Sequence, residues 1–573
     1  MILISCEEDS PTGLSNGDVT ISDNTIVIEE EGNVSIDSVS DGEIVLSFTG
    51  SAPDISVGDI LVSGEGNGFL RKVTSTSVEG NTITVTTQNA RITDAVENGS
   101  VDTTIPITIS TSALGKGVNY NAIEGVTLVA GGIDLTNVIL YSGSVSGEIL
   151  TVSITEGSID FSPSLNIGFK VESGKIQEFH AVADGDLTLD VDFRATSTGD
   201  VVHSDEIYLI SIPIGQFVQF IGIFPVVEVV TLDIYAGFKT NIQASGDLVV
   251  GLDNTSSVSV GAKYDQGQWT SVWENTSSLT SHPITWPLSS SIELEGYVEP
   301  RISVKFYAVA GPYISVVPNL LFDGEIGGAY AWFYELKGGI SANLGFDVSV
   351  LGYQLANYST ELLNWETLLE SDQSTWSLLI QDTDETWERD IDKLYVTSNS
   401  TSVVFQLITN GEWIDPHSEE SGIDVGIFID VDQNTNTGLN EGSDYHYQPN
   451  DIGADYVAVV GVEGDSLWNW QDTSWNKLTD FQFLNLDNNS NTFEVGVRLS
   501  DIGNPSAIDI VIANITFGAD TTYWDWAPNA GHVTYNISSG TISLAKSGFS
   551  IKNRNTVSVS KTKGMRLIPK NRR

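Results

Sequence analysis

The sequence contains little cysteine, methionine or positive charge, and each shortage excludes a class of protein. A single cysteine in 573 residues excludes an internal disulfide framework. Lys and Arg number 25 against 76 Asp and Glu, which gives a net charge of −51. A nucleic-acid binder needs a basic face to displace counterions, so we expect no nucleic-acid partner. Charged residues make up only 18% of the chain and hydrophobic residues 40%, which excludes a disordered polyanion.

Long apolar runs and catalytic motifs are also missing. The most apolar stretch, residues 207–232, contains two prolines and a glutamate, so it predicts a pair of buried strands rather than a membrane-spanning helix. No zinc-protease motif, phosphate-binding loop or paired-cysteine site occurs, and the six histidines are scattered. We therefore expect surface or turn histidines and no enzymatic activity. A hydrolase whose site assembles from distant residues would leave no such motif.

Short alternating segments fill the rest of the chain and indicate β-structure. Residues 187–193 and 292–298 alternate apolar and polar side chains, as strands with one wet face do. Residues 257–269 predict a hairpin around a Gln-Gly turn. The leucines of 361–370 predict the one longer helix. We predict an all-β, multi-domain protein of antiparallel β-sandwiches or barrel-like modules with few short helices.

Changes in composition divide the chain into five segments. The tail carries nine Lys or Arg and no Asp or Glu, which predicts either a solvated disordered end or electrostatic docking. The expected segments are a tether (1–16), a small β module (17–112), a large antiparallel β domain of one or two subdomains (113–372), a β-sandwich (373–545) and a basic tail (546–573).

The single cysteine lies near the amino terminus. The run Leu3-Ile4-Ser5-Cys6 resembles the bacterial lipobox, and the acidic residues after it resemble a lipoprotein tether. The resemblance implies lipidation of Cys6 and anchoring on the outer surface of the bacterial envelope by more than one acyl chain; without lipidation we expect secretion. Only five residues precede Cys6, fewer than the apolar core of a signal peptide, so we expect the natural start to lie upstream. The alternative is an ordinary cysteine after a short apolar start.

A series of motifs marks residues 376–540. They are the strand pair 392–398 and 403–407, the acidic run 426–438 and the segment 453–456. This series resembles the DOMON-like β-sandwich superfamily, which includes the family-nine carbohydrate-binding modules. Members bind sugars or haem. A haem ligand would usually be methionine, and both methionines lie outside this segment, so the resemblance implies a sugar.

An oxygen-rich loop within this segment has the spacing of a calcium site. Positions 1, 3, 5, 7 and 12 of the calcium-loop pattern are Asp430, Asp432, Asn434, Asn436 and Glu441. Position 6 is not glycine and a strand precedes the loop, which excludes an EF-hand. We expect a structural β-loop calcium site completed by Asp455 or Asp451. The alternative is a polar turn whose side chains cap the backbone.

Five tryptophans of the same segment are the candidate sugar-binding residues. Trp468 and Trp470, and likewise Trp524 and Trp526, are two residues apart and so share a strand face, while Trp475 follows a turn. Flat indoles suit the apolar faces of sugar rings; the alternative is packing in the sandwich core. We predict a non-catalytic surface protein that binds glycan, for adhesion or polysaccharide capture.

A second hypothesis makes the middle block a scaffold or carrier for a hydrophobic ligand or an envelope partner. It is suggested by Phe217, Phe220 and Phe224 and the Val and Ile residues around them.

Overall fold

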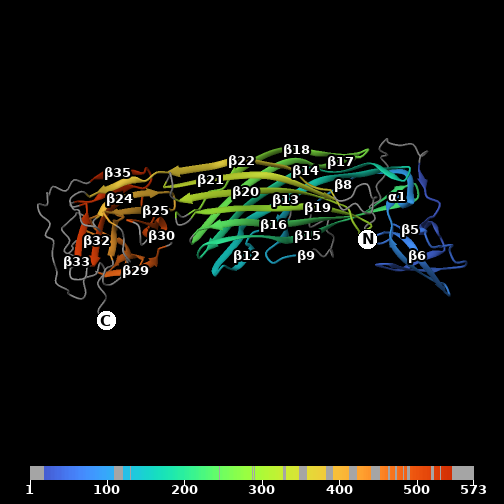
Figure 1. Cartoon of the computed structure of the whole chain (residues 1–573), viewed down its shortest axis with the longest axis horizontal. Coiled ribbons are helices and arrows are strands. Elements are labelled where there is room, and N and C mark those ends of the chain that lie inside the picture. The colour runs from blue at the N-terminus through green and yellow to red at the C-terminus, as the bar shows by residue number, and fades with distance from the viewer. Residues whose placement is uncertain are drawn as a thin grey trace.

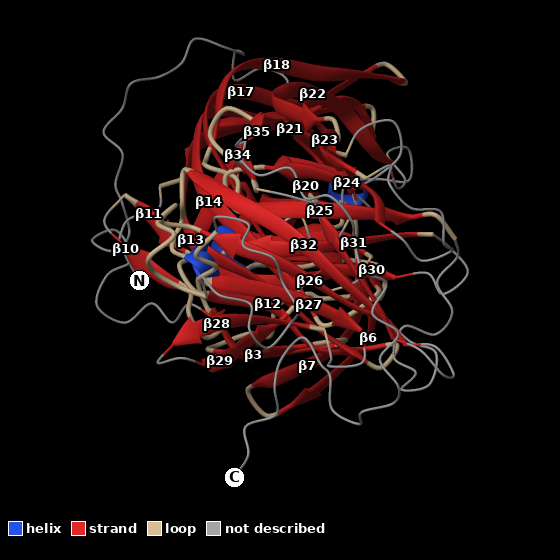
Figure 2. Ribbon diagram, turned by 90° about the vertical axis from the view of Figure 1, so that its left-hand side faces the viewer, coloured by secondary structure: helices blue, strands red, loops and turns tan. Residues whose placement is uncertain are grey.

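The structure is a computed structural model. The residues that it describes are 19–108, 121–129, 131–243, 245–286, 288, 291–326, 331–346, 358–382, 391–411, 423–439, 452–461, 465–471, 474–481, 483–486, 491–517, 522–528 and 531–544. Three β-rich parts follow one another along an extended molecule, from the first module (blue) to the carboxyl-terminal sandwich (orange and red) (Figure 1). Figure 2, which looks along this axis, shows strands throughout. The all-β prediction is confirmed.

The first module is one six-stranded sheet with short helical turns beside it. Its pairing is antiparallel except between the first two strands. The strand order is β2 (Thr25–Val27), β5 (Ile60–Ser63), β6 (Phe69–Glu79), β7 (Thr82–Asn89), β4 (Glu43–Phe48) and β3 (Val34–Ser40). The turns are the 3-10 helix η1 (Ile28–Glu30) and the α-helix α1 (Ile92–Ala95).

The middle part is a sandwich of two sheets with strands of up to 25 residues. The first sheet has the order β1 (Thr20–Ile21), β8 (Val96–Pro106), β13 (Glu148–Glu172), β14 (Lys175–Ser197), β17 (Gly246–Asp265) and β18 (Gln268–Ser281), with β10 (Thr127–Val129), β11 (Gly132–Asp134) and β12 (Val138–Val145) attached. The second has the order β22 (Tyr358–Ser374), β21 (Trp332–Phe346), β20 (Pro312–Ile326), β19 (Ile292–Phe306), β16 (Phe224–Ile242), β15 (Val201–Ile221) and β9 (Asn121–Ala122).

Alternating burial explains why these long strands form a sandwich. Along β14 the apolar residues between 187 and 193 are buried and the intervening residues face outward. Across the interior, Gly296 of β19 leaves room for Phe193, because a Cβ there would lie 2.9 Å from the ring. The apolar stretch 207–232 forms the β15–β16 hairpin, and 257–269 forms the β17–β18 hairpin, as predicted.

The helix predicted at 361–370 is wrong, because this segment belongs to strand β22. Two bulges explain the misleading pattern. Leu336 and Lys337 of β21 pair with Glu370 and Leu368, so Leu369 is an extra residue. A second bulge leaves Leu362 extra in the same way. Each bulge shifts the two-residue period by one, so the leucine pairs imitate helical spacing.

The carboxyl-terminal part is a second sandwich. Its smaller sheet has the order β23 (Ser377–Gln381), β24 (Ile391–Ser398), β25 (Ser402–Thr409), β31 (Thr492–Arg498) and β30 (Phe483–Leu486). Its larger sheet has the order β29 (Ser474–Asp480), β28 (Ser466–Gln471), β27 (Tyr456–Gly461), β26 (Ile423–Asp430), β32 (Ala507–Phe517), β34 (Val533–Asn536) and β35 (Thr541–Leu544), with β33 (Thr522–Ala527) paired to β32. The 3-10 helix η3 (Leu499–Ile502) follows β31.

The first module and the middle sandwich are joined by more than a linker. Strand β8, within the expected first module, runs in the middle sheet beside β13. Val27, Ile60, Val62 and Leu70 of the first module belong to the middle core. No helix among the described residues is long and apolar enough to cross a membrane.

Candidate binding face and cation cluster

Strand β26 separates the two chemical environments of the carboxyl-terminal sandwich. Val425, Ile427 and Ile429 point into the core between the sheets, because alternate residues of a strand share a face. Phe428 points to the opposite face and belongs to a separate apolar cluster. An outer face of an antiparallel sheet is ordinarily polar, whereas this cluster is apolar. Phe428 is only 4% exposed, so the candidate contact residues are the partly buried side chains that pack around it.

Four of the five candidate tryptophans lie in this outer cluster. Trp526 of β33 stacks on Phe428, with ring centroids 5.7 Å apart. Phe428 in turn contacts Trp475 at 6.1 Å, and Trp475 meets Trp470 edge to face at 5.2 Å. Trp468 packs against the same cluster. The rings therefore form one continuous aromatic face across β33, β26, β29 and β28, which we call the tryptophan face.

The members of the tryptophan face differ in exposure. Trp475 is only 4% exposed, so it is a packing residue. Trp468, Trp470 and Trp526 are half-buried and keep part of their rings accessible. The side chain of Trp524 lies outside the described part of the structure. Sequence reasoning missed Phe428, the ring that connects Trp526 to Trp475.

An acidic cluster lies at the end of β26. Carboxylate oxygens of Asp430, Asp432 and Asp455 all lie within 4.8 Å of one another. Asp430 Oδ2 accepts a hydrogen bond from the Gly453 N–H at 3.0 Å, and Asp455 Oδ2 accepts one from the Val431 N–H at 3.1 Å. These bonds hold segment 452–455 against the loop, so acids 25 residues apart in sequence converge.

The electrostatics of the cluster favour a cation. Asp430 is fully buried, and its Oδ1 has no hydrogen-bond partner among the described residues. Burial raises the pKa of Asp430 to about 6, with the charges of Asp455 and Asp432 adding to the effect against the opposing Gly453 bond. Burial also raises the pKa of Asp455. Three hard oxygens with an unsatisfied buried one among them are the environment that a divalent cation relieves.

Two of the remaining predicted ligands, Asn434 and Asn436, take part in a hydrogen-bonded turn that begins at Asp432. Asp432 Oδ1 accepts from the Asn434 N–H, and Asn434 Oδ1 accepts from the Asn436 N–H. Both amides are exposed and stabilise the turn, as the polar-turn alternative describes. The loop therefore combines a turn with an acidic cluster. Glu441 and Asp451 lie outside the described residues.

Histidines also differ from the sequence-based expectation, because three of them pair with carboxylates distant in sequence. His532 Nε2 lies 3.3 Å from Asp509 of β32, and both are largely buried. His282 lies 2.8 Å from Asp192, and His180 lies 3.4 Å from Asp102. The pairing arises from strand register, which residue spacing does not reveal.

The middle block gives little support to the second hypothesis, in which it carries a hydrophobic ligand or binds an envelope partner. Phe224 is fully buried in a continuous apolar core, Phe217 is half-buried against it, and Phe220 is 65% exposed. The three rings thus lie in different environments.

Comparison with known proteins gives no relative: no family model matches the chain, and neither a curated protein nor a solved structure is similar to it.

Proposed function

We propose that this chain is a non-catalytic glycan-binding protein whose carboxyl-terminal sandwich holds sugar on the tryptophan face. The observation that carries the proposal is the set of half-buried Trp468, Trp470 and Trp526 on an outer sheet face. Indole faces bind the apolar faces of sugar rings. A cluster of aromatic side chains with accessible edges is typical of a recognition surface.

Calcium and a lipid anchor complete the proposal. Asp430, Asp432 and Asp455 would hold a structural Ca²⁺ at the end of β26, two residues from Phe428 of the tryptophan face. The anchor would be Cys6, which lies outside the described residues. Together they describe an adhesive or polysaccharide-capturing protein on the bacterial cell surface.

Alanine substitution on the tryptophan face tests the function. Trp470→Ala and Trp526→Ala should each weaken binding in a glycan array about thirtyfold, because a hot-spot residue contributes about 2 kcal/mol and each 1.4 kcal/mol is tenfold. Trp365→Ala is the matched control, because Trp365 is a 36% exposed tryptophan of the middle sandwich. It should bind as wild type.

Thermal unfolding of the same variants separates binding from folding. If both tryptophan-face variants bind every glycan as wild type does, or lose binding only in proportion to unfolded protein, the proposed function is wrong.

A further inference from the structure

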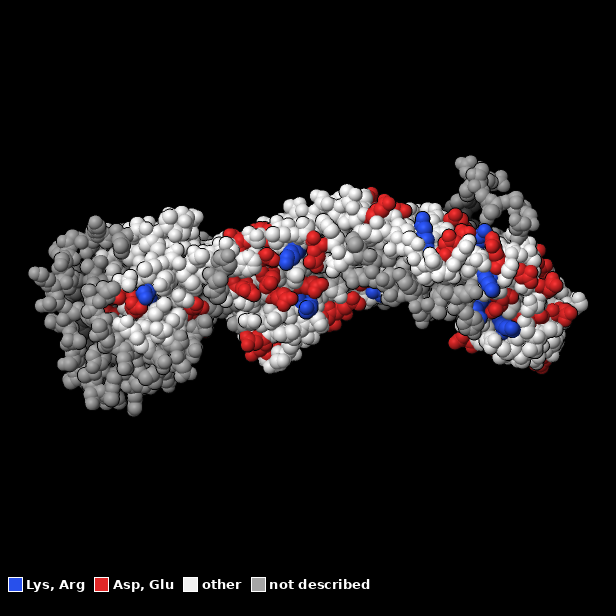
Figure 3. All heavy atoms as spheres, turned by 45° about the horizontal axis from the view of Figure 1, so that its top comes forward, with Lys and Arg blue, Asp and Glu red and all other residues white. Residues whose placement is uncertain are grey.

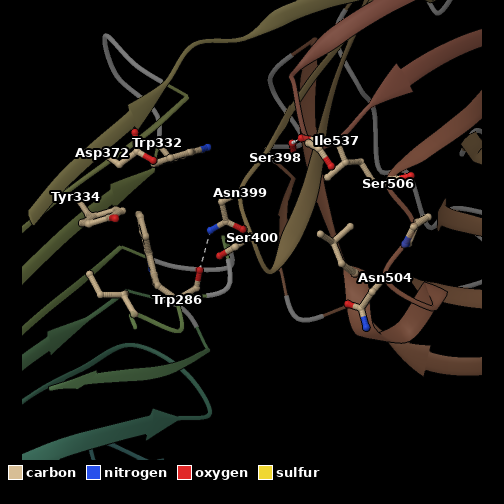
Figure 4. A pocket seen from close by; sticks show the side chains of 14 residues that line it. Trp286, Trp332, Tyr334, Asp372, Ser398, Asn399, Ser400, Asn504, Ser506 and Ile537 are labelled. Atoms are coloured by element: carbon tan, nitrogen blue, oxygen red, sulfur yellow. Dashed lines mark hydrogen bonds between the residues drawn. The ribbon is translucent and has the colours of Figure 1, made fainter. Parts of the chain in front are cut away.

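A cleft of about 530 Å³ lies where the middle sandwich meets the carboxyl-terminal sandwich (Figure 4). One wall is aromatic and comes from the end of the middle sandwich. The other wall is polar and comes from the turn after β24, the segment after η3 and the segment after β34. The lining includes Trp286, Trp332, Tyr334, Asp372, Ser400 and Ser506.

The aromatic wall consists of parallel and perpendicular rings. Trp332 and Tyr334 lie two residues apart on β21, with rings 6.2 Å apart and only 10° from parallel. Trp286 meets both edge to face, at 6.4 Å and 6.0 Å. This packing fixes the ring orientations, so the wall is preorganised.

The two walls are held at a fixed separation. Asn399 Nδ2 donates to the Trp286 carbonyl oxygen at 3.0 Å, and Thr401 Oγ1 donates to the same oxygen at 3.1 Å. Figure 4 shows the first of these bonds as the dashed line between Asn399 and Trp286. Asn399 Oδ1 also accepts from the backbone N–H groups of Thr401 and Ser402, so the bridging turn is rigid.

An unsatisfied donor lies at the aromatic wall. Trp332 is 4% exposed, and its indole N–H has no acceptor among the described residues. In Figure 4 its nitrogen points away from Tyr334 and toward the carboxyl-terminal sandwich. A buried donor without a partner is unfavourable, and a ligand oxygen that reached this edge of the cleft would satisfy it.

Charge selects the ligand class. Asp372 is the one acidic residue among the described residues of the lining, which include no Lys, Arg or His. The whole chain carries a net charge of −51, and acid side chains gather over the middle sandwich (Figure 3). An anionic ligand would be repelled, whereas a neutral polyol can donate hydroxyls to Asp372 and present an apolar face to the rings.

We infer that this cleft is a second ligand site, separate from the tryptophan face, for one ring of a neutral saccharide. Tyr334, the half-buried ring of the aromatic wall, packs against the apolar face of the saccharide ring, and the buried Trp286 and Trp332 hold it in place. Asp372 and the serine hydroxyls of the opposite wall bind its hydroxyl groups. The inference does not depend on sugar binding at the tryptophan face.

The test fills the cleft from its polar wall, so that the aromatic core stays intact. Ser400 and Ser506 are exposed, and Ser506→Trp or Ser400→Trp places an indole in the cleft. Ser500→Trp is the matched control, because Ser500 is an exposed serine of the same sandwich outside the lining. The probes are methyl glycosides of glucose, galactose and mannose, with methyl glucuronide as the anionic counterpart, titrated calorimetrically into the full chain.

At least one neutral glycoside should bind wild type and Ser500→Trp equally, and bind Ser506→Trp about tenfold or more weakly. The Trp470→Ala and Trp526→Ala variants should retain this binding. The inference is wrong if no neutral glycoside binds, or if one binds Ser506→Trp as tightly as wild type. It is also wrong if methyl glucuronide binds wild type as tightly as the neutral glycosides do. Binding lost only in Trp470→Ala or Trp526→Ala overturns the cleft and leaves the tryptophan face standing.

Discussion

Glu228 is the most unfavourable residue of the middle sandwich. It is fully buried on β16, and neither carboxylate oxygen has a hydrogen-bond partner among the described residues. Burial raises its pKa from an ordinary 4.5 to about 8, so the native chain keeps this group neutral at pH 7. Its strand neighbours Val226 and Val230 on the same face are fully buried apolar residues. The sequence shows the glutamate in an apolar run, but not which face it takes.

Stability of the middle sandwich should therefore fall with rising pH. Between pH 4.5 and 8 the native state holds a proton on Glu228 that the unfolded state has lost, so the free energy of unfolding decreases as pH rises. The loss should be on the order of 5 kcal/mol, since each pKa unit is worth about 1.4 kcal/mol. Glu228→Gln removes the titration, so it should raise the melting temperature at pH 9 and leave it nearly unchanged at pH 4.

Glu299 provides the control for this prediction. It is also a buried glutamate, but Arg301 donates to it at 3.0 Å and 2.7 Å. Glu299→Gln should destabilise at neutral pH, because it leaves the guanidinium without its charged partner. A Glu228→Gln variant with the same pH profile as wild type would refute the account of Glu228.

At the scale of elements, two-residue periodicity predicted most strands and failed where a bulge interrupts it. The hairpins β15–β16 and β17–β18 were predictable because their residues alternate or form continuous apolar runs. Strand β22 was not, because the extra residues Leu362 and Leu369 shift its period. Pairing with β21 then decides the conformation, and it is absent from local sequence.

For the candidate-site residues too, local sequence predicts which side chains share a strand face, but not which other strands they meet. The spacing of Trp468 and Trp470 predicted a shared face, but their contact with Phe428 depends on strand order. Trp332 and Tyr334 have the same spacing, a signal that could have pointed to the cleft; the partner wall is more than 60 residues away in sequence.

The loop after β26 should make the stability of the carboxyl-terminal sandwich depend on calcium. Millimolar calcium should raise the melting temperature of the carboxyl-terminal sandwich, because a ligand that binds only the native state stabilises it, by about 2.7 kcal/mol at 100 times the dissociation constant. Asp430→Asn keeps an acceptor for the Gly453 N–H but removes the charge. It should abolish the calcium shift in differential scanning fluorimetry.

The other acidic group of the described residues supplies the control. Asp190, Asp253 and His282 also converge, but His282 already pairs with Asp192, and the two acids of the group are exposed. Asp253→Asn should keep the full calcium shift. A shift that survives Asp430→Asn would leave the acidic loop with only its turn role.

On the scale of the whole molecule, the distribution of cores decides which parts unfold together. The middle core includes residues of the first module such as Ile60 and Leu70, and β8 connects the two parts through main-chain pairing. The carboxyl-terminal sandwich has its own core. Its links to the middle sandwich include Val404, which packs in the middle core, the Asn399 turn, which bonds to Trp286, and Thr397, whose hydroxyl donates to Ser374 of β22.

Two calorimetric transitions should follow from this arrangement. The first module and middle sandwich should unfold together, with about twice the enthalpy of the carboxyl-terminal sandwich, because unfolding enthalpy scales with residue number. Calcium should move only the smaller transition, whereas Glu228→Gln at pH 9 should move only the larger. One transition that responds to both changes would mean that the Val404 and Asn399 contacts couple the two sandwiches into a single cooperative unit, and the cleft between them would then open only on global unfolding.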